Sequence, residues 1–163
     1  MAEADWLDED EMRAWLAFLQ AAVLVSEELE RALQAGHDLS LADYEVLAFL
    51  SAEPGWRLRM SDLADRALLT RSRLTHTVDR LERFGFVERV ACETDRRGSY
   101  ASLTDAGMES LRRAAPGHVA AVRRILIDVL THDEIVALAA GLGRVVGERG
   151  AGTNAEVGRA APK

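Results

Sequence analysis

One short segment of the chain combines hydroxyl and guanidinium side chains at helical spacing. Between residues 70 and 84, apolar residues recur every three or four positions, which predicts a helix with one buried face. The opposite face carries small hydroxyls and long cations, which donate hydrogen bonds to base edges and phosphates. The pattern therefore favours a helix that enters the major groove of DNA. The residues of this candidate surface are Thr70, Arg71, Ser72, Arg73, Thr75, His76 and Arg80.

A solvent-exposed helix face of mixed charge is the alternative interpretation, and a second basic segment argues against it. Arg96 and Arg97 lie in a polar stretch between two predicted strands. Arginines at the tip of a hairpin reach a minor groove, because its negative potential attracts them. Asp95 beside them is expected to fix the loop by pairing with an arginine, either Arg80 or Arg97.

The charge distribution agrees with a contact surface in the middle of the chain. The net charge of −7 argues, on its own, against binding to nucleic acid. However, residues 57–97 contain 10 Arg and 7 acidic residues, whereas residues 1–56 contain 2 Arg and 13 acidic residues. Affinity for phosphate depends on the cations within about 10 Å, not on the total charge. The central block is therefore the expected contact, and the acidic block is expected to point away from it.

The elements that must position these residues follow from capping residues and periodicity. Residues 56–60 predict a short strand, and residues 86–90 and 100–103 predict a hairpin. Pro116 lies inside the fifth predicted helix, so a kink or break is expected near residues 114–117. The order of helix, short helix, turn, longer helix and hairpin is typical of a winged helix-turn-helix, a mainly α fold with a small β-wing. The N-cap residues expected for the six helices are Asp8, Ser40, Ser61, Thr70, Thr104 and Thr131.

Four short motifs occupy this central region. They are MSDLA at residues 60–64, LTHTVDRLERFGFVER at residues 74–89, DRR at residues 95–97 and LTDAG at residues 103–107. As a set they resemble the MarR (multiple antibiotic resistance regulator) family of dimeric winged-helix transcription regulators. The resemblance implies that Thr75 and His76 face the groove and that Arg97 is the wing-tip arginine. His76 stands where an Arg or another long donor is common in this family, which leaves the base preference at this position open.

The chain is expected to form one domain, residues 1–163, that acts as a homodimer. By resemblance, residues 1–37 and 105–146 are dimerisation helices that flank a winged helix-turn-helix at residues 38–104. Residues 147–163 lack periodicity and are expected to form a disordered tail. The first helix would span about 40 Å, longer than a globule of this size needs. Two recognition helices in successive major grooves would require a pseudo-palindromic operator in double-stranded DNA.

The resemblance also implies that the protein is a repressor controlled by a small aromatic or phenolic effector. Trp15, Phe18 and Trp56 are the candidate ligand-binding residues, because aromatic walls with a few polar groups suit such a cleft. The alternative interpretation is that these three side chains belong to the core.

No cofactor, metal site or catalytic site is expected. His37, His76, His118 and His132 lack the spacing of a metal-binding set, and no arrangement of nucleophile and base can be identified. The chain is therefore not expected to be an enzyme. It has no apolar run of membrane-spanning length and no visible signal peptide. With Cys92 as the single cysteine, these features predict a reduced, cytoplasmic protein.

Two other function classes remain open at this stage. A winged helix can be a protein-interaction module, which would be indicated by a wing and helix without basic residues, whereas both are basic here. A redox-switched regulator would require an exposed, reactive Cys92, whereas a half-buried thiol is the expected state.

Overall fold

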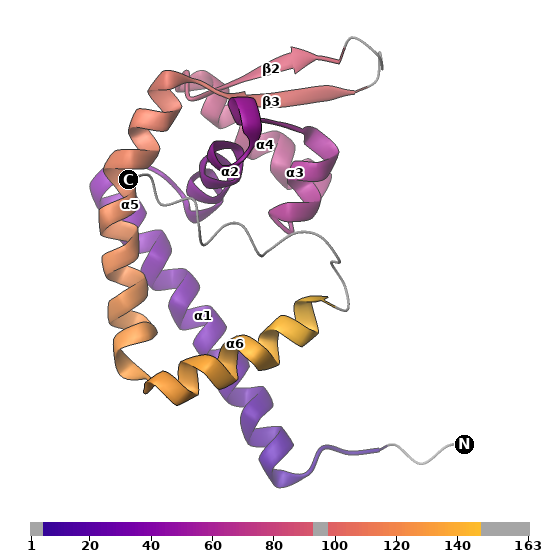
Figure 1. The fold of residues 1–163 in the computed structure, drawn as a ribbon, viewed down its shortest axis with the longest axis vertical. Coiled ribbons are helices and arrows are strands. Elements are labelled where there is room, and N and C mark those ends of the chain that lie inside the picture. The colour runs from indigo at the N-terminus through magenta and orange to yellow at the C-terminus, as the bar shows by residue number, and fades with distance from the viewer. Residues whose placement is uncertain (1–4, 93–97, 148–163) are drawn as a thin grey trace.

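The computed structural model describes residues 5–92 and 98–147 of the chain. This part contains six α-helices and a three-stranded antiparallel sheet, in the predicted order (Figure 1). Turns of 3-10 helix follow α2 at Pro54–Trp56 and α5 at Ile127–Val129. The predicted tail, residues 147–163, lies outside the described residues except for Gly147, the last residue of α6. The elements are α1 (Glu9–His37), α2 (Leu41–Ala52), β1 (Arg57–Arg59), α3 (Met60–Arg66), α4 (Arg71–Arg83), β2 (Val87–Ala91), β3 (Ser99–Leu103), α5 (Asp105–Ile125) and α6 (His132–Gly147).

Side-chain caps begin most of the helices at the predicted residues. In α1, Asp8 accepts from the backbone N–H of Glu11, whose carboxylate accepts from the N–H of Asp8. The helix continues past Gly36, the predicted end, and stops where Asp38 adopts a left-handed conformation with φ 55°. The other predicted caps that the structure confirms are Ser40, Thr70, Thr104 and Thr131.

The start of α3 differs from the prediction. Ser61 is not the N-cap, because α3 already begins at Met60 and its N-cap residue, Arg59, makes no side-chain capping bond. The hydroxyl of Ser61 donates instead to Asp62 Oδ1 at 3.0 Å. The physical reason is that β1 runs directly into α3, so the last strand residue occupies the capping position.

The helices α2, α3 and α4 pack with the sheet into a unit that we call the lobe. Strand β3 lies in the centre of the sheet, with β1 and β2 antiparallel on either side. The register pairs Leu58 with Ala101 and Val87 with Leu103, and all four side chains are buried. The largest fully buried apolar side chains of the lobe are Val46, Leu47, Leu50, Leu63, Leu74, Val78 and Leu81.

Two glycines fix the passage from α4 through the sheet into α5. Gly85 has φ 72°, a left-handed conformation that favours glycine, and it turns the chain from α4 into β2. At Gly107, in the first turn of α5, a Cβ would lie 2.1 Å from the carbonyl oxygen of Phe86. The same oxygen accepts from the backbone N–H of Thr104 at 3.0 Å. The start of α5 is therefore seated directly on the α4–β2 turn.

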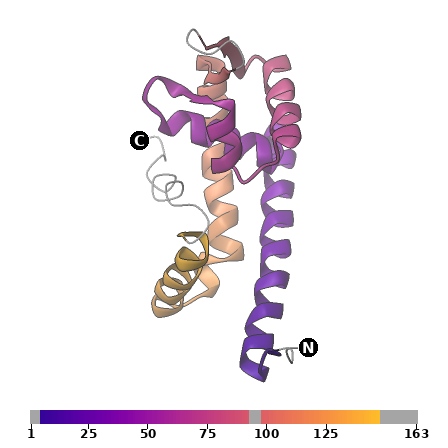
Figure 2. The ribbon, with the colours of Figure 1, turned by 90° about the vertical axis from the view of Figure 1, so that its right-hand side faces the viewer.

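The helices α1 and α5 lie side by side and extend away from the lobe, with α6 at their far end (Figures 1 and 2). We call these three helices the stem. Of the kink or break predicted near residues 114–117, the break is wrong, because α5 continues through Pro116 from Asp105 to Ile125. Pro116 is exposed, while Ala114 and Ala121 on either side of it are buried, so the packed face of α5 is uninterrupted.

The stem leaves much of its apolar surface uncovered. Within the described residues, no side chain of α6 is buried, and α1 buries only Leu29 and Leu33. No helix in the described ranges combines the length and apolar character needed to cross a bilayer. The exposed apolar side chains include Met12, Trp15, Leu16, Leu19, Val23 and Leu24 on α1, and Val136, Leu138, Leu142, Val145 and Val146 on α6.

Candidate nucleic-acid interface

The helix α4 presents one face to the lobe core and the other to solvent, as predicted. Thr70 caps it by accepting from the backbone N–H of Arg73 at 3.2 Å. Its first turn carries no acidic residue, so the positive end of the helix dipole is not neutralised there. The residues that α4 buries are Leu74, Thr77, Val78 and Leu81.

The exposed face holds most of the predicted contact residues. Ser72 and His76 lie one turn apart and are exposed. Thr75 is also exposed, and its hydroxyl donates to the carbonyl oxygen of Arg71 at 2.8 Å. While that bond is made, the oxygen of Thr75 is an acceptor toward solvent. The face thus offers short polar groups of both kinds.

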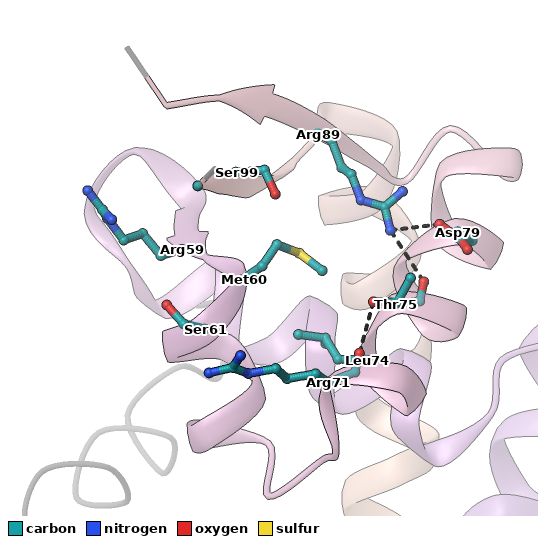
Figure 3. Close-up of a pocket in the computed structure, with 10 residues that line it drawn as sticks. Arg59, Met60, Ser61, Arg71, Leu74, Thr75, Asp79, Arg89 and Ser99 are labelled. Carbon is teal, nitrogen blue, oxygen red and sulfur yellow. Dashed lines mark hydrogen bonds and ion pairs between the residues drawn. The ribbon is translucent and has the colours of Figure 1, made fainter. Parts of the chain in front are cut away.

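A cavity of about 580 Å³ lies between the start of α3, the face of α4 and the base of the hairpin (Figure 3). Its walls include the three arginines Arg59, Arg71 and Arg89, which come from β1, α4 and β2. Thr75 and Ser99 line it as well. Asp79 also lines the cavity and pairs with Arg89, so Arg59 and Arg71, next to exposed hydroxyls, are the cations that make this surface suitable for an anionic backbone.

Arg89 fastens the base of the hairpin to α4. Its guanidinium pairs with Asp79 at 2.6 Å and donates to the carbonyl oxygen of Thr75 at 3.3 Å (Figure 3). It also pairs with Glu82. Glu82 also accepts from the backbone N–H of Arg89 at 2.9 Å. Because Arg89 pairs with the carboxylates of both Asp79 and Glu82, it acts as a structural link between β2 and α4.

Two arginines of this cavity, Arg59 and Arg89, were not predicted from the sequence. Arg59 donates to the sulfur of Cys92 at 3.5 Å and lies over the ring of Tyr100, 5.5 Å from its centroid. Arg89 is three residues into β2. Arg57 and Arg59 stand on either side of Leu58, which is the alternating spacing of a strand. This spacing, just before the predicted helix pair, is the signal that could have indicated basic side chains along one face of that strand.

Arg73 and Arg80 lie on the flank of α4 that faces α2. Burial raises the pKa of Glu45 on α2, and the charge of Arg73 opposes that shift. Arg80 forms an ion pair with Asp43 at 3.0 Å and donates to the carbonyl oxygen of Asp38 at 2.9 Å. The guanidinium of Arg80 thus points toward the α1–α2 junction, while its predicted contacts with DNA and with Asp95 stay predictions.

The tip of the wing, with Asp95, Arg96 and Arg97, lies outside the described residues. The strands on either side of it are described, and they pair in regular register from Val87–Leu103 to Ala91–Ser99. The predicted hairpin is therefore present, while the role of its arginines stays a prediction.

The three aromatic residues predicted for an effector site lie in two regions. Trp15 and Phe18 stack with ring centroids 6.2 Å apart on α1, and both rings are about half exposed. Trp56 packs against the lobe core instead. Within the structure of one chain, these residues do not form a common pocket.

Cys92 is buried at the end of β2, more deeply than the half-buried thiol that was expected. Its burial argues against the redox alternative, which requires an exposed thiol. Within residues 5–92 and 98–147, no three His, Cys, Asp or Glu side chains form a group that could hold a metal ion.

Comparison with known proteins gives one consistent family. A model of the MarR family matches residues 37–98. The chain is 39% identical to Sco3205, a MarR family transcriptional regulator from Streptomyces coelicolor crystallised in complex with DNA, with 96% of this chain and 98% of that chain covered and a TM-score of 0.86. It is 41% identical to AbsC, a MarR family transcriptional regulator from the same organism, covering 89% and 97% of the two chains with a TM-score of 0.82. It is also 29% identical, over 140 residues, to the HTH-type transcriptional regulator PecS of Dickeya dadantii (strain 3937), covering 85% and 83%. The match to the Sco3205 structure confirms the predicted winged helix-turn-helix fold.

Proposed function

Because the chain belongs to the MarR family of transcription regulators, we propose that it binds a specific operator in double-stranded DNA as a homodimer. The observation that carries the proposal is the exposed face of α4, where Ser72, Thr75 and His76 lie beside a cavity lined by arginines. A relative of 39% identity and closely similar fold was crystallised with DNA. We propose that α4 enters the major groove.

The wing supplies the second contact in this proposal. In this proposal Arg96 and Arg97, which directly precede the cavity-lining residues Gly98 and Ser99 in the sequence, contact the DNA. Arginine side chains at a hairpin tip are suited to a minor groove, because a narrow minor groove has an enhanced negative potential. Along α4, Thr70, Arg71 and Arg73 are the proposed phosphate contacts of the first turn.

The stem supplies the proposed dimer contact. Exposed apolar residues run along α1 and α6, with Trp15 and Val23 about half exposed and Val145 more so. A large apolar surface of this kind is costly in water and marks a protein interface. A two-fold axis through the stem would place one α4 in each of two successive major grooves, which requires a pseudo-palindromic operator.

The proposed mechanism is repression by occupation of the operator, in the cytoplasm, and the proposed role is regulatory rather than catalytic. A small aromatic or phenolic effector is proposed to bind near Trp15 and Phe18, whose stacked rings lie on the uncovered face of α1. Such a ligand changes DNA affinity only as far as it binds the two states of the dimer differently.

The test of groove entry is a substitution at His76. Its side chain is exposed in the middle of α4 and, in this proposal, reads base edges. We expect His76→Ala to cost about 1–3 kcal/mol on the preferred operator and little on random DNA, because a base contact carries sequence information and a phosphate contact does not. Fluorescence anisotropy on both DNAs measures this difference.

Asp65→Asn is the control, since Asp65 is exposed on α3, outside α4 and outside the stem that supplies the proposed dimer contact. It should leave both affinities unchanged. If His76→Ala also left the operator affinity unchanged, the exposed face of α4 would not lie in the groove.

A further inference from the structure

Asp43 is a charged residue at the centre of the junction between α1 and α2. It is 1% exposed, although an isolated carboxylate is costly to bury. Its Oδ2 accepts from the backbone N–H of Ser40 at 2.8 Å and from the hydroxyl of Ser40 at 2.7 Å. These two neutral donors cap α2, but they do not neutralise the charge.

The cation that balances Asp43 comes from α4. Arg80 Nη1 lies 3.0 Å from Asp43 Oδ2, and Arg80 Nη2 donates to the carbonyl oxygen of Asp38 at 2.9 Å. The guanidinium also lies over the ring of Phe84, 5.5 Å from its centroid. Two sides of the guanidinium fork are thus in use, and only 34% of the Arg80 side chain is exposed. Its planar shape suits it to bridge two acceptors at once.

The two acceptors, the carboxylate of Asp43 and the carbonyl oxygen of Asp38, lie at the junction between the stem and the lobe. Asp38 is the residue that ends α1 in a left-handed conformation, and Ser40 begins α2 two residues later. Asp38, Asp43 and Arg80 therefore connect three elements, α1, α2 and α4. The long helix α1 belongs to the stem, so the bridge relates the direction of the stem to the position of α4.

We infer that Arg80 is a positioning residue that holds α4 at a fixed orientation to the end of α1, and that it does not bind DNA. The inference deepens the proposed function and rests on it, because the orientation of α4 matters when two copies must fit two grooves. A phosphate contact by Arg80 would require its guanidinium to leave Asp43, and the buried carboxylate would then be without its cation. We expect the bridge to persist, because that exchange would leave a buried charge unpaired.

The first test is a double-mutant cycle on operator affinity with Arg80→Ala, Asp43→Asn and the double variant. We expect each single variant to weaken binding about tenfold, and the double variant to bind no more weakly than the weaker of the two single variants, because both substitutions remove the same bridge. If Asp43→Asn left affinity unchanged while Arg80→Ala lowered it, a direct contact of Arg80 with DNA would replace the inference.

The salt dependence of binding separates the two roles further. Removing a side chain that touches phosphate would flatten the slope of log K against log salt by about 0.9 for each phosphate no longer neutralised. For Arg80→Ala we expect the slope of the unaltered protein. Arg71→Ala, which removes a proposed phosphate-binding side chain from the same helix, is the control that should flatten it. A flattened slope for Arg80→Ala would overturn the inference.

A distance measurement without DNA tests the bridge independently of the proposed function. Spin labels at Ala17→Cys on α1 and Ser72→Cys on α4, in a Cys92→Ala background, report the orientation of α4 within one chain when labelled protein is diluted with unlabelled protein. We expect Arg80→Ala and Asp43→Asn to broaden or shift this distance, and Arg80→Lys to do so less. Folded variants with an unchanged distance would overturn the inference, even if DNA binding were abolished. If the variants broadened the distance but the unaltered protein bound no DNA, the proposed function would be refuted and the bridge would stand.

Discussion

The lobe and the stem differ in how far their apolar side chains are buried within one chain. In the lobe, Leu47, Leu63 and Leu81 are completely buried among helices and sheet of the same chain. In the stem, side chains of similar size such as Val23 and Val145 are more than half exposed. Burial of apolar surface is the main favourable contribution to folding, so the lobe has its core within one chain. The stem is proposed to complete its own core with a second chain.

The largest effect is expected from a charge in the uncovered face of the stem. We expect Val23→Glu to dissociate the dimer and to abolish tight operator binding, because the carboxylate would be buried without a partner in the interface. Light scattering at micromolar concentration should give the 17.9 kDa chain mass instead of twice that value. Leu68→Glu, at a lobe residue that is 78% exposed, is the control that should remain dimeric. A variant at Val23 with the dimer mass would place the interface elsewhere.

A substitution in the lobe core should have a smaller effect of a different kind. Leu47 is fully buried, so Leu47→Ala leaves a cavity and is expected to lower the free energy of unfolding by about 2–5 kcal/mol. Urea denaturation measures this decrease. The decrease should be independent of protein concentration, whereas the unfolding of a dimer held by the stem should depend on it. A decrease at Leu47 that grew on dilution would mean that the lobe core also depends on the second chain.

The smallest effect is expected where the two regions meet. His118 on α5 stacks on Tyr44 of α2 with ring centroids 4.1 Å apart, and its Nδ1 finds no hydrogen-bond partner among the described residues. Burial lowers the pKa of His118 below its usual value of 6.5. The unfolded chain therefore binds the proton more readily, and stability should fall as the pH drops below about 6.5 toward the folded pKa.

The variant His118→Phe keeps a ring on Tyr44 and removes the titrating group. Urea denaturation between pH 8 and pH 5 should show that this variant loses less stability than the unaltered protein. Glu28 and Glu134 also have lowered pKa values, but their contributions disappear at more acidic pH, below their usual value of 4.5. An equal decrease of stability in both proteins above pH 5 would show that His118 does not titrate on unfolding.

Much of the fold could be predicted from the sequence because its signals are local. The predicted caps at Asp8, Ser40 and Thr70 each depend on residues within one helical turn. The buried face of α4 followed from a period of three to four residues. Together these signals predict the order of the elements and the exposed face of α4.

The parts of the site that could not be predicted from the sequence depend on residues far apart in the chain. Arg80 meets Asp43 across 37 positions, and no local pattern distinguishes it from an arginine that faces DNA. At Ser61 and Pro116 the neighbouring structure decides instead of the residue type. A strand directly before α3 and a packing face along α5 override the local preference.

Selection of bound fragments from a pool of random duplex DNA tests the central claim most directly, because it presupposes no operator. For a dimer that inserts α4 into two successive major grooves, the enriched sequences should contain two inverted half-sites about 10 base pairs apart, centre to centre. Each half-site should lose its enrichment when the selection is repeated with His76→Ala. Enrichment of a single, unrepeated site, or no enrichment at all, would contradict the proposal that this chain binds DNA as a symmetric dimer through α4.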